Sequence, residues 1–362
     1  MRVGLLGCWV AIAVSLMVAG RAAAATVRVV VERDREEYAG DPCRYRTVVV
    51  YRAGPRERNV VSVREAGRRL IIRDRAARVR AGARCEQLSR NAASCQVRTD
   101  TPDGQGEADW DAPGVSVNAG DLDDRVVAPQ RRSAIGLQIT ASLGAGDDTA
   151  SLGHADYVTG GPGDDRVQVR GRSTADVRGE DGDDVLVAGA GPNSLDGGAG
   201  NDVLEGGPGA DTLLPGEGDD RARGGAGVDM LSYTDPRGVR VDLARNRASS
   251  AVGRVRLRSV EGAWAGTGND VLIGDARANS FSSFGGRDVM RTGAGDDALE
   301  VPAAGSSCGP GVDTVIVPTV NDLAGRMREP APARLRTRAV QPAREHRATH
   351  AGRARSCGAA RP

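Results

Sequence analysis

The chain has 362 residues, a formal net charge of +1, 50 glycines and only 3% aromatic residues. So few large side chains exclude a conventional core along the whole length, and composition alone would permit disorder. The near-neutral charge hides a segregation, since residues 116–325 hold 32 acidic residues against 19 arginines, whereas residues 326–362 hold ten arginines against two glutamates. Something other than large apolar side chains must therefore hold the acidic segment together.

Residues 1–25 are predicted to be an export signal. Arg2 precedes an apolar run from Val3 to Val18, and Ala22–Ala25 offers an Ala-x-Ala cleavage site. A retained transmembrane helix is the weaker alternative, because the run is short and no stop-transfer charges follow it. We therefore expect a secreted, extracellular protein without a transmembrane segment after cleavage, in a compartment where disulfides form and calcium is plentiful.

Residues 26–115 contain strand-like runs and are predicted to form a small β domain or an N-terminal cap for a solenoid. After cleavage the chain keeps five cysteines, an odd number, so at least one thiol has no partner within the chain. Cys85 and Cys95 are close enough in sequence to bridge a hairpin-sized loop. We expect these two to form a disulfide.

The middle of the chain repeats with a period of nine residues. From Asp184 to Asp229 an aspartate, or once Asn193, recurs at every ninth position, introduced by glycines and followed two positions later by an apolar residue. A second run extends from Asp270 to Asp297, with Asn279 in the place of one acid. Looser copies contain Asp124, Asp148, Asp156, Asp165 and Asp313. Because nine is the period of neither a helix nor a strand, it must be the length of a structural unit.

Each unit divides into two halves with different conformational preferences. The glycine-rich half can turn tightly and expose its carbonyl groups, and the last three residues are predicted to form a short strand with one side chain inward. Two units make one coil of roughly 18 residues, and coils stack about 4.8 Å apart. Stacking then aligns Asp184, Asp202 and Asp220 on one edge, and Asp211 and Asp229 on the other.

Stacked carboxylates repel each other and raise each other's pKa. A hard divalent cation between the coils would remove this repulsion and use the turn carbonyls as further oxygen ligands. Calcium, which takes six to eight oxygens in flexible geometry, suits such a site better than magnesium. The alternative is that the Asp-Gly units are the turns of a metal-free solenoid, or an acidic low-complexity linker.

The repeats resemble the calcium-binding nonapeptide G-G-x-G-x-D-x-U-x of the RTX (haemolysin-type) family. The resemblance covers roughly Gly120–Val317 and is clearest at GGAGNDVLEG (Gly197–Gly206) and GGPGADTLL (Gly206–Leu214). It implies an all-β fold, a parallel β-roll or β-solenoid with Ca2+ between adjacent turns, and weaker or empty sites at Asn193 and Asn279. The segment FGGRDVM (Phe284–Met290) departs from the full glycine pattern. The metal ligands implied by the resemblance are Asp148, Asp165, Asp184, Asp202, Asp211, Asp220, Asp229, Asp270, Asp288 and Asp297.

The repeats are expected to occupy residues 116–232 and 264–317, with an inserted β-hairpin at residues 233–263. Alternation of Val239, Val241 and Leu243, and then of Val255 and Leu257, predicts the two strands of that hairpin. Residues 318–362, rich in Arg, Ala and Pro, are predicted to be a disordered tail.

The sequence favours a calcium-binding structural or adhesive module over an enzyme. It contains no H-E-x-x-H and no G-x-S-x-G motif. The enzymatic alternative is a polysaccharide lyase or epimerase on the solenoid, with Asp235, Arg237 and Arg240 as the candidate cluster. The expected partners are calcium ions and a cell-surface or extracellular polymer. Nucleic acid is not expected, because the chain offers no aromatic platform and is predicted to be exported.

Overall fold

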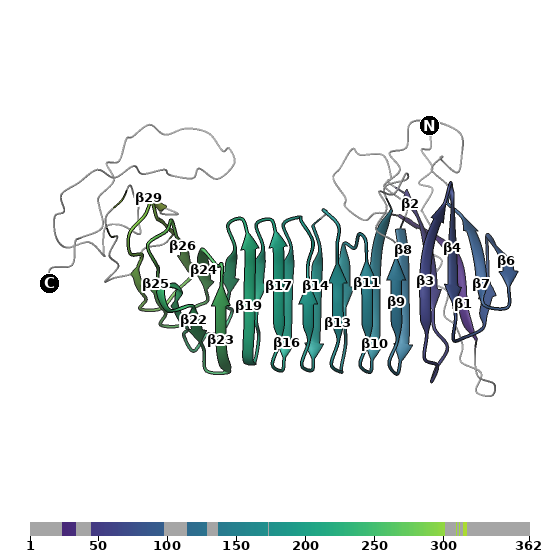
Figure 1. Ribbon diagram of the computed structural model, residues 1–362, viewed down its shortest axis with the longest axis horizontal. Coiled ribbons are helices and arrows are strands. Elements are labelled where there is room, and N and C mark those ends of the chain that lie inside the picture. The colour runs from purple at the N-terminus through teal and green to yellow at the C-terminus, as the bar shows by residue number, and fades with distance from the viewer. Residues whose placement is uncertain are drawn as a thin grey trace, which may run out of the picture.

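A computed structural model describes residues 24–33, 45–97, 114–128, 137–172, 174–300, 309, 311 and 314–316. Residues 1–23 of the predicted export signal, Asp313 and the tail from residue 318 lie outside the described residues. Two long β-sheets face each other along an elongated solenoid (Figure 1).

Within the described residues, sheet 1 has 14 strands and forms one wall of the solenoid. Its strands, in spatial order, are β29 (Thr314–Ile316), β28 (Ala298–Glu300), β26 (Ser280–Ser283), β24 (Gly262–Ala265), β20 (Met230–Ser232), β18 (Thr212–Leu214), β16 (Ser194–Ala199), β14 (Asp176–Asp181), β12 (Tyr157–Thr159), β10 (Gln138–Ala145), β8 (Gly114–Asp121), β2 (Tyr45–Arg52), β1 (Ala25–Arg33) and β5 (Val79–Ala81).

Sheet 2 forms the opposite wall, with 15 strands in the part of the chain that the structure describes. Its strands, in spatial order, are β27 (Val289–Arg291), β25 (Val271–Ile273), β21 (Arg240–Asp242), β22 (Arg247–Ser249), β23 (Gly253–Arg258), β19 (Gly218–Ala226), β17 (Val203–Pro208), β15 (Val185–Val187), β13 (Arg166–Val169), β11 (Thr149–Leu152), β9 (Arg125–Ala128), β3 (Val60–Ala66), β4 (Arg69–Asp74), β7 (Ala92–Gln96) and β6 (Cys85–Ser89).

From β8 to β20 the chain alternates between the two sheets, and each strand pairs in parallel with the strand one coil further on. The register shows the coil length directly: Leu186 lies opposite Leu204, and Leu195 lies opposite Leu213. Both separations equal the 18 residues expected of two nonapeptide units. The predicted all-β fold, a parallel β-roll, is therefore confirmed.

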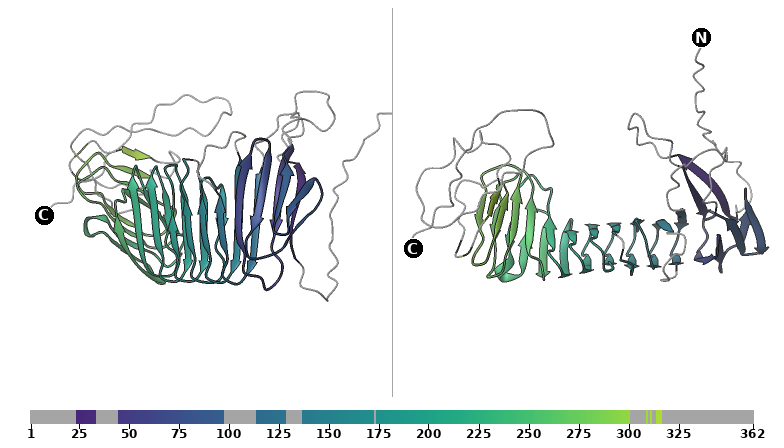
Figure 2. Two further views of the ribbon diagram at one scale, coloured as in Figure 1. Left: turned by 45° about the vertical axis from the view of Figure 1, so that its right-hand side comes forward. Right: turned by 90° about the horizontal axis from the view of Figure 1, so that it is seen from above.

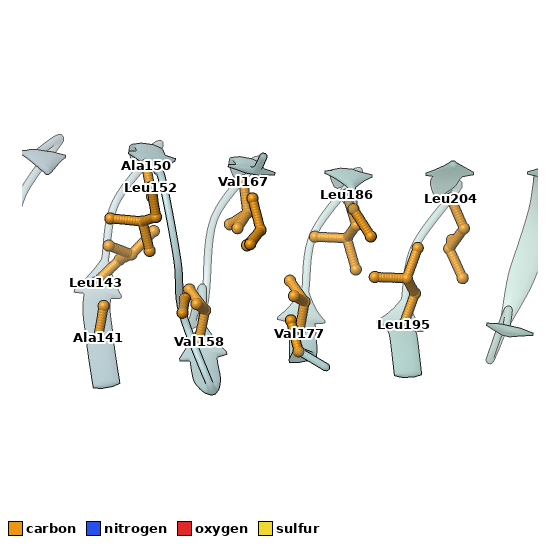
Figure 3. Packing of buried hydrophobic residues seen from close by; sticks show 14 of the residues in the cluster. Ala141, Leu143, Ala150, Leu152, Val158, Val167, Val177, Leu186, Leu195 and Leu204 are labelled. Carbon is orange, nitrogen blue, oxygen red and sulfur yellow. The ribbon is translucent and has the colours of Figure 1, made fainter. Parts of the chain in front are cut away.

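The core is a double row of small aliphatic side chains, one from nearly every strand. Figure 3 shows Val158, Val177 and Leu195 of sheet 1 pointing toward side chains of sheet 2. These residues are fully buried. Several three-residue strands bury only their middle side chain, as β15 does with Leu186. A core this thin needs no large residues, which explains how a chain with so few aromatics forms an ordered structure.

The glycine-rich turns bring successive coils into backbone contact. Gly163 has a φ of 136°, a left-handed conformation that favours glycine, and a Cβ there would collide with the carbonyl oxygen of Gly146 one coil away. The repeated glycines therefore meet a requirement of the turn and of the stacking.

The strands of residues 25–97 continue both sheets beyond the first coil. Strand β2 pairs in parallel with β8, and β3 pairs in parallel with β9. Antiparallel pairs then extend each sheet outward. In sheet 1, β1 pairs with β2. In sheet 2, β3 pairs with β4, β4 with β7, and β7 with β6. Cys85 and Cys95 lie opposite each other on β6 and β7 and form a disulfide, so that prediction is confirmed.

The insertion differs from the expected hairpin by one strand. Strands β21 and β23 do not pair with each other, because β22 lies between them and is antiparallel to both. The extra reversal arises in a 3-10 turn (η1, Leu243–Arg245), where the Asp242 carboxylate accepts the backbone N–H of Arg245 and Asn246 takes a left-handed φ of 52°. Val239, Val241, Leu243, Val255 and Leu257 are all buried, as the alternation predicts.

The insertion also separates two stretches of the array. In sheet 1, β20 pairs directly with β24, whereas in sheet 2 three strands lie between β19 and β25. Figure 2, in the view from above, shows the strands of the central coils end on and those of the C-terminal stretch lengthwise. We call residues 137–232 the first block and residues 264–300 the second block.

Candidate metal centres

The aspartates at the sixth position of the repeats are buried and stack in two columns. In the first column the backbone N–H of Asp165 donates to Oδ1 of Asp184 at 2.8 Å, and that of Asp184 donates to Oδ1 of Asp202 at 2.9 Å. In the second column the N–H of Asp211 donates to Oδ1 of Asp229 at 2.9 Å. The two edges expected from an 18-residue coil are therefore present. All ten aspartates predicted as metal ligands are at most 4% exposed.

The second carboxylate oxygen of these residues is the unusual feature of the site. In eight aspartates Oδ2 is buried and accepts no hydrogen bond from any described residue. A buried polar atom without a partner is costly, and a buried charge more so. Such a row therefore indicates a ligand that carries positive charge. The eight residues are Asp124, Asp148, Asp165, Asp184, Asp202, Asp211, Asp220 and Asp229.

At five of these positions a backbone carbonyl faces the same point as Oδ2. Oδ2 of Asp165 and the carbonyl oxygen of Gly179, one coil further on, both point at the place where a Cβ of Gly160 would stand. We call this arrangement, formed by a glycine five positions before the aspartate, a glycine cradle. The five cradles pair Gly160 with Asp165, Gly179 with Asp184, Gly197 with Asp202, Gly206 with Asp211, and Gly224 with Asp229.

Burial raises the pKa of the column aspartates in the first block. It brings the pKa of Asp165 and Asp202 to about 7 and that of Asp184 to about 6, against the ordinary 3.8. Hydrogen bonds from backbone N–H groups oppose the shift, and neighbouring carboxylates add to it. The sequence argument stressed mutual repulsion, whereas the larger cause is removal from water.

The donor set fits a hard cation. No cluster of three His, Cys, Asp or Glu side chains exists within the described residues. Each glycine cradle instead offers one carboxylate and one turn carbonyl, so every donor there is an oxygen. Calcium accepts carboxylate and backbone carbonyl oxygens in flexible geometry, as this arrangement requires.

In the second block a serine takes the position of the cradle glycine. Ser283 stands five positions before Asp288, and its hydroxyl donates to Oδ2 of Asp288 at 2.6 Å and to Oδ2 of Asp270 at 3.3 Å. Both predicted ligands thus have a partner from the chain itself. Backbone stacking is kept, since the N–H of Asp270 donates to Oδ1 of Asp288 at 2.9 Å.

In the second column, an arginine neutralises the acid that stacks next to Asp229. Glu261 takes the place of an aspartate there, because its Oε2 accepts the backbone N–H of Asp229 at 3.1 Å. The Arg277 guanidinium lies 2.7 Å from Oε1 of Glu261 and 2.8 Å from Oδ2 of Asp275. Asn279 donates through Nδ2 to the carbonyl of Glu261 at 3.2 Å. The chain supplies the positive charge at this level itself.

The remaining predicted positions have no glycine cradle. A residue larger than glycine stands five positions before each of them: Leu143 before Asp148, Pro215 before Asp220, and Thr292 before Asp297. At Asn193 the corresponding residue is Ala188, and the Asn193 amide donates to Oδ1 of Asp211 at 2.9 Å. The ten aspartates therefore fall into classes, whereas the sequence separated only the looser copies at Asp148 and Asp165 and the incomplete glycine pattern at Asp288.

A second, exposed ladder was missed in the sequence. The residues before the acids of the first column also stack: the backbone N–H of Asp183 donates to Oδ1 of Asp164 at 2.9 Å, and that of Asn201 donates to Oδ1 of Asp183 at 2.7 Å. The recurring doublets Asp-Asp and Asn-Asp were the available signal. Glu261 gave no such signal, because the insertion breaks the nine-residue phase before it.

The trio proposed for an enzymatic site is not shown as one cluster. Arg237 pairs with Asp235 at 3.0 Å in an exposed loop, whereas Arg240 lies on β21 and faces Asp242 at 3.6 Å. Each of these arginines therefore has its own acidic partner.

Comparison with known families agrees with this geometry. The RTX calcium-binding nonapeptide repeat matches in four copies, at residues 140–167, 178–213, 216–233 and 264–299. A search of curated proteins gave no match. Within the described residues no helix is long and apolar enough to cross a membrane. The repeats of this chain therefore belong to the RTX calcium-binding nonapeptide family, and the cation that they bind is Ca2+.

Proposed function

We propose that the protein is an exported module whose β-roll becomes ordered when Ca2+ binds between stacked turns, and that it serves as a structural or adhesive component outside the cell. One observation carries the proposal. Buried aspartate oxygens without a hydrogen-bond partner recur from coil to coil, and at five levels a backbone carbonyl faces the same point. The charge of the first block has the same implication, since residues 137–232 hold 18 acidic residues against six arginines.

The proposed calcium ligands are the column aspartates together with turn carbonyls. The five glycine cradles are the strongest candidates, because Oδ2 and a carbonyl oxygen converge there. Asp148, Asp220 and Asp297 are proposed as weaker sites, and Asp270 and Asp288 as the weakest, since Ser283 already donates to both. Bound calcium supplies positive charge to the carboxylates. Because the unfolded chain lacks such a site, its binding free energy adds to folding.

Two features support export and a role in binding. The N-terminal residues have the pattern of an export signal, and the Cys85–Cys95 disulfide suits an oxidising compartment. The repeats bring together acids positioned for a cation, and the described structure does not unite the trio proposed for lyase chemistry. A binding module is therefore better supported than an enzyme.

The direct test uses the full mature chain. Far-UV circular dichroism in a chelator, in millimolar Mg2+ and in millimolar Ca2+ should show β structure increasing strongly only with Ca2+, while equilibrium dialysis counts the bound ions. Equal β content in chelator and in Ca2+, with no bound ions, would contradict the proposal. Uronide turnover by the calcium-loaded protein would instead support the enzymatic alternative.

A further inference from the structure

The sign of the surface charge inverts at the insertion. Residues 137–218 hold four arginines against 15 acidic residues, whereas residues 221–258 hold nine arginines against three aspartates. The aspartate pattern ends at the same point, because Arg254 and Val255 of β23 lie opposite Asp219 and Asp220 of β19. The insertion therefore replaces acidic turns with basic strands.

Strand register concentrates these arginines on the outer face of sheet 2. Arg256 of β23 lies opposite Arg221 of β19 on one side and Arg247 of β22 on the other. All three are exposed, while Val255 and Leu257 between the outward residues are buried. In Figure 1 these strands lie between the central coils and the C-terminal stretch of the array. Like charges directly opposite each other destabilise a sheet, so this row needs an explanation other than stability.

The same arginines line a groove of about 770 Å³. Arg240 and Arg245 share Asp242 as an ionic partner, at 3.6 and 2.9 Å. The other four arginines of the groove have no ion pair with a described residue. No aromatic residue lines the groove. Its lining consists of Asp219, Asp220, Arg221, Arg240, Asp242, Arg245, Asn246, Arg247, Ala248, Ser249, Arg254, Val255 and Arg256.

The chemistry of the groove selects an anion with repeated charges. Guanidinium groups bind carboxylate and sulfate groups through paired N–H donors. The row of Arg221, Arg256 and Arg247 crosses three neighbouring strands, which lie about 4.8 Å apart, so it presents a line of cations rather than a single point. Single-stranded nucleic acid requires aromatic platforms for its bases, and the groove has none.

We infer that this groove binds a linear acidic polysaccharide, with Arg221, Arg247, Arg254 and Arg256 contacting its carboxylate or sulfate groups. The groove shares Asp220 with the first calcium column, but its arginines are not calcium ligands, and binding of an anion there goes beyond calcium-dependent folding. It still needs the folded roll, so if the proposed function holds, it needs calcium.

The test measures binding of the full mature chain in buffered millimolar Ca2+ by isothermal titration. The probes are a sulfated dextran oligomer, an oligogalacturonate, neutral dextran and a single-stranded oligodeoxynucleotide. The variant Arg254→Gln/Arg256→Gln should lose at least tenfold in affinity for the anionic saccharides. The matched variant Arg64→Gln/Arg73→Gln removes the same charge from exposed strand positions on β3 and β4 and should stay within twofold. Sulfated and carboxylated probes distinguish the two anionic groups.

Folding is followed separately by circular dichroism, so failure of the roll to fold is distinguished from failure of the groove. We expect the groove variant to keep the wild-type spectrum and to melt close to the wild type, because Arg256→Gln removes opposed like charges whereas Arg254→Gln removes a charge that lies opposite Asp219. The inference is overturned by equal loss in both variants, by unchanged affinity in the groove variant, by binding to none of the saccharides, or by preference for the oligonucleotide. A groove variant that melts lower and binds saccharide normally would identify the arginines as structural.

Discussion

The first block and the second block share one backbone arrangement but satisfy their buried acids differently. In the first block the Oδ2 atoms of Asp165, Asp184 and Asp202 have no hydrogen-bond partner among the described residues. In the second block Ser283 donates to the Oδ2 atoms of Asp270 and Asp288. Just beyond the insertion, Arg277 pairs with Glu261.

The difference shows that one repeat motif can be completed in two ways. A glycine five positions before the acid allows Oδ2 and a carbonyl of the next coil to face the same point, as at Gly197. A serine in that position, or an arginine nearby, brings a donor from the chain itself. We therefore expect the first block to depend on calcium strongly and the second block weakly. Four predictions test this contrast.

The largest effect should come from pH, since it acts on many levels at once. The pKa of Asp124, Asp165 and Asp202 is raised to about 7, and that of Asp148, Asp184, Asp220 and Asp229 to about 6. A raised carboxyl pKa means that the folded state binds more protons than the unfolded state, so stability falls as pH rises through 6 to 7. In chelator, the melting temperature should therefore be higher at pH 5 than at pH 8.

With saturating Ca2+ the sign should reverse, because protons then compete with the cation for the same oxygens. Thermal melts at both pH values, with and without calcium, check both statements. A calcium-free melting temperature that rises between pH 5 and pH 8 would show that the column carboxyls are not the groups that titrate.

Filling one cradle should be the most damaging single substitution. Gly197→Ala places a Cβ against Oδ2 of Asp202 and the carbonyl of Pro215. We expect a loss of about 3 kcal/mol of calcium-dependent stability, from overpacking together with an uncompensated buried carboxylate. The matched control is Gly285→Ala in the second block, where a Cβ would meet its nearest atoms at 3.8 Å. Chemical denaturation in Ca2+ should leave the control near wild type, and equal losses would refute the cradle.

Neutralising a column acid should cost more stability in the first block than in the second. Asp202→Asn removes a carboxylate from a cradle and should cost about 2 kcal/mol, the scale for an uncompensated buried polar site. Asp288→Asn retains a side-chain oxygen for Ser283 and should cost less than about 1 kcal/mol. Calcium titrations followed by circular dichroism measure, for each variant, the Ca2+ concentration at which half of the protein is folded. If Asp288→Asn demands as much extra calcium as Asp202→Asn, the two blocks are not different in kind.

The smallest effect should come from replacing Arg277, the positive charge that the chain itself places beside Glu261. Arg277→Gln leaves Glu261 and Asp275 without their guanidinium partner, and because Arg277 is half-exposed the cost should be only about 1 kcal/mol. The variant should also need more calcium to protect the second block in hydrogen exchange. Arg178→Gln, which breaks the exposed pair with Asp176, is the control and should have no such effect. Unchanged calcium demand in Arg277→Gln would argue against neutralisation by the chain.

Much of the fold could be predicted from the nine-residue period. The period fixes the coil at 18 residues, and hence the stacking of Asp184 on Asp202 and the burial of Leu186 and Leu204. The third strand of the insertion could not be predicted, because it depends on the left-handed turn at Asn246 rather than on any alternation of apolar residues.

The candidate site could be predicted only in part. Position in the repeat identified the acids but could not rank them by expected calcium affinity, because that affinity depends on which groups lie near each Oδ2 in the folded chain. Arg277 and Glu261 are 16 residues apart, and only the stacking of coils brings their side chains together. The residue at the first position of each unit, glycine or serine, was visible in the sequence and carried information that the motif comparison left unused.

The most direct test of the central claim is a crystal structure of the calcium-loaded protein with anomalous scattering from Ca2+, or from Tb3+ in its place. Anomalous peaks are expected at the cradles of Gly160, Gly179, Gly197, Gly206 and Gly224, bonded to Oδ2 of the paired aspartate, with none beside Ser283. Peaks beside Ser283 as strong as those in the first block, or an absence of peaks at the five cradles, would contradict the account.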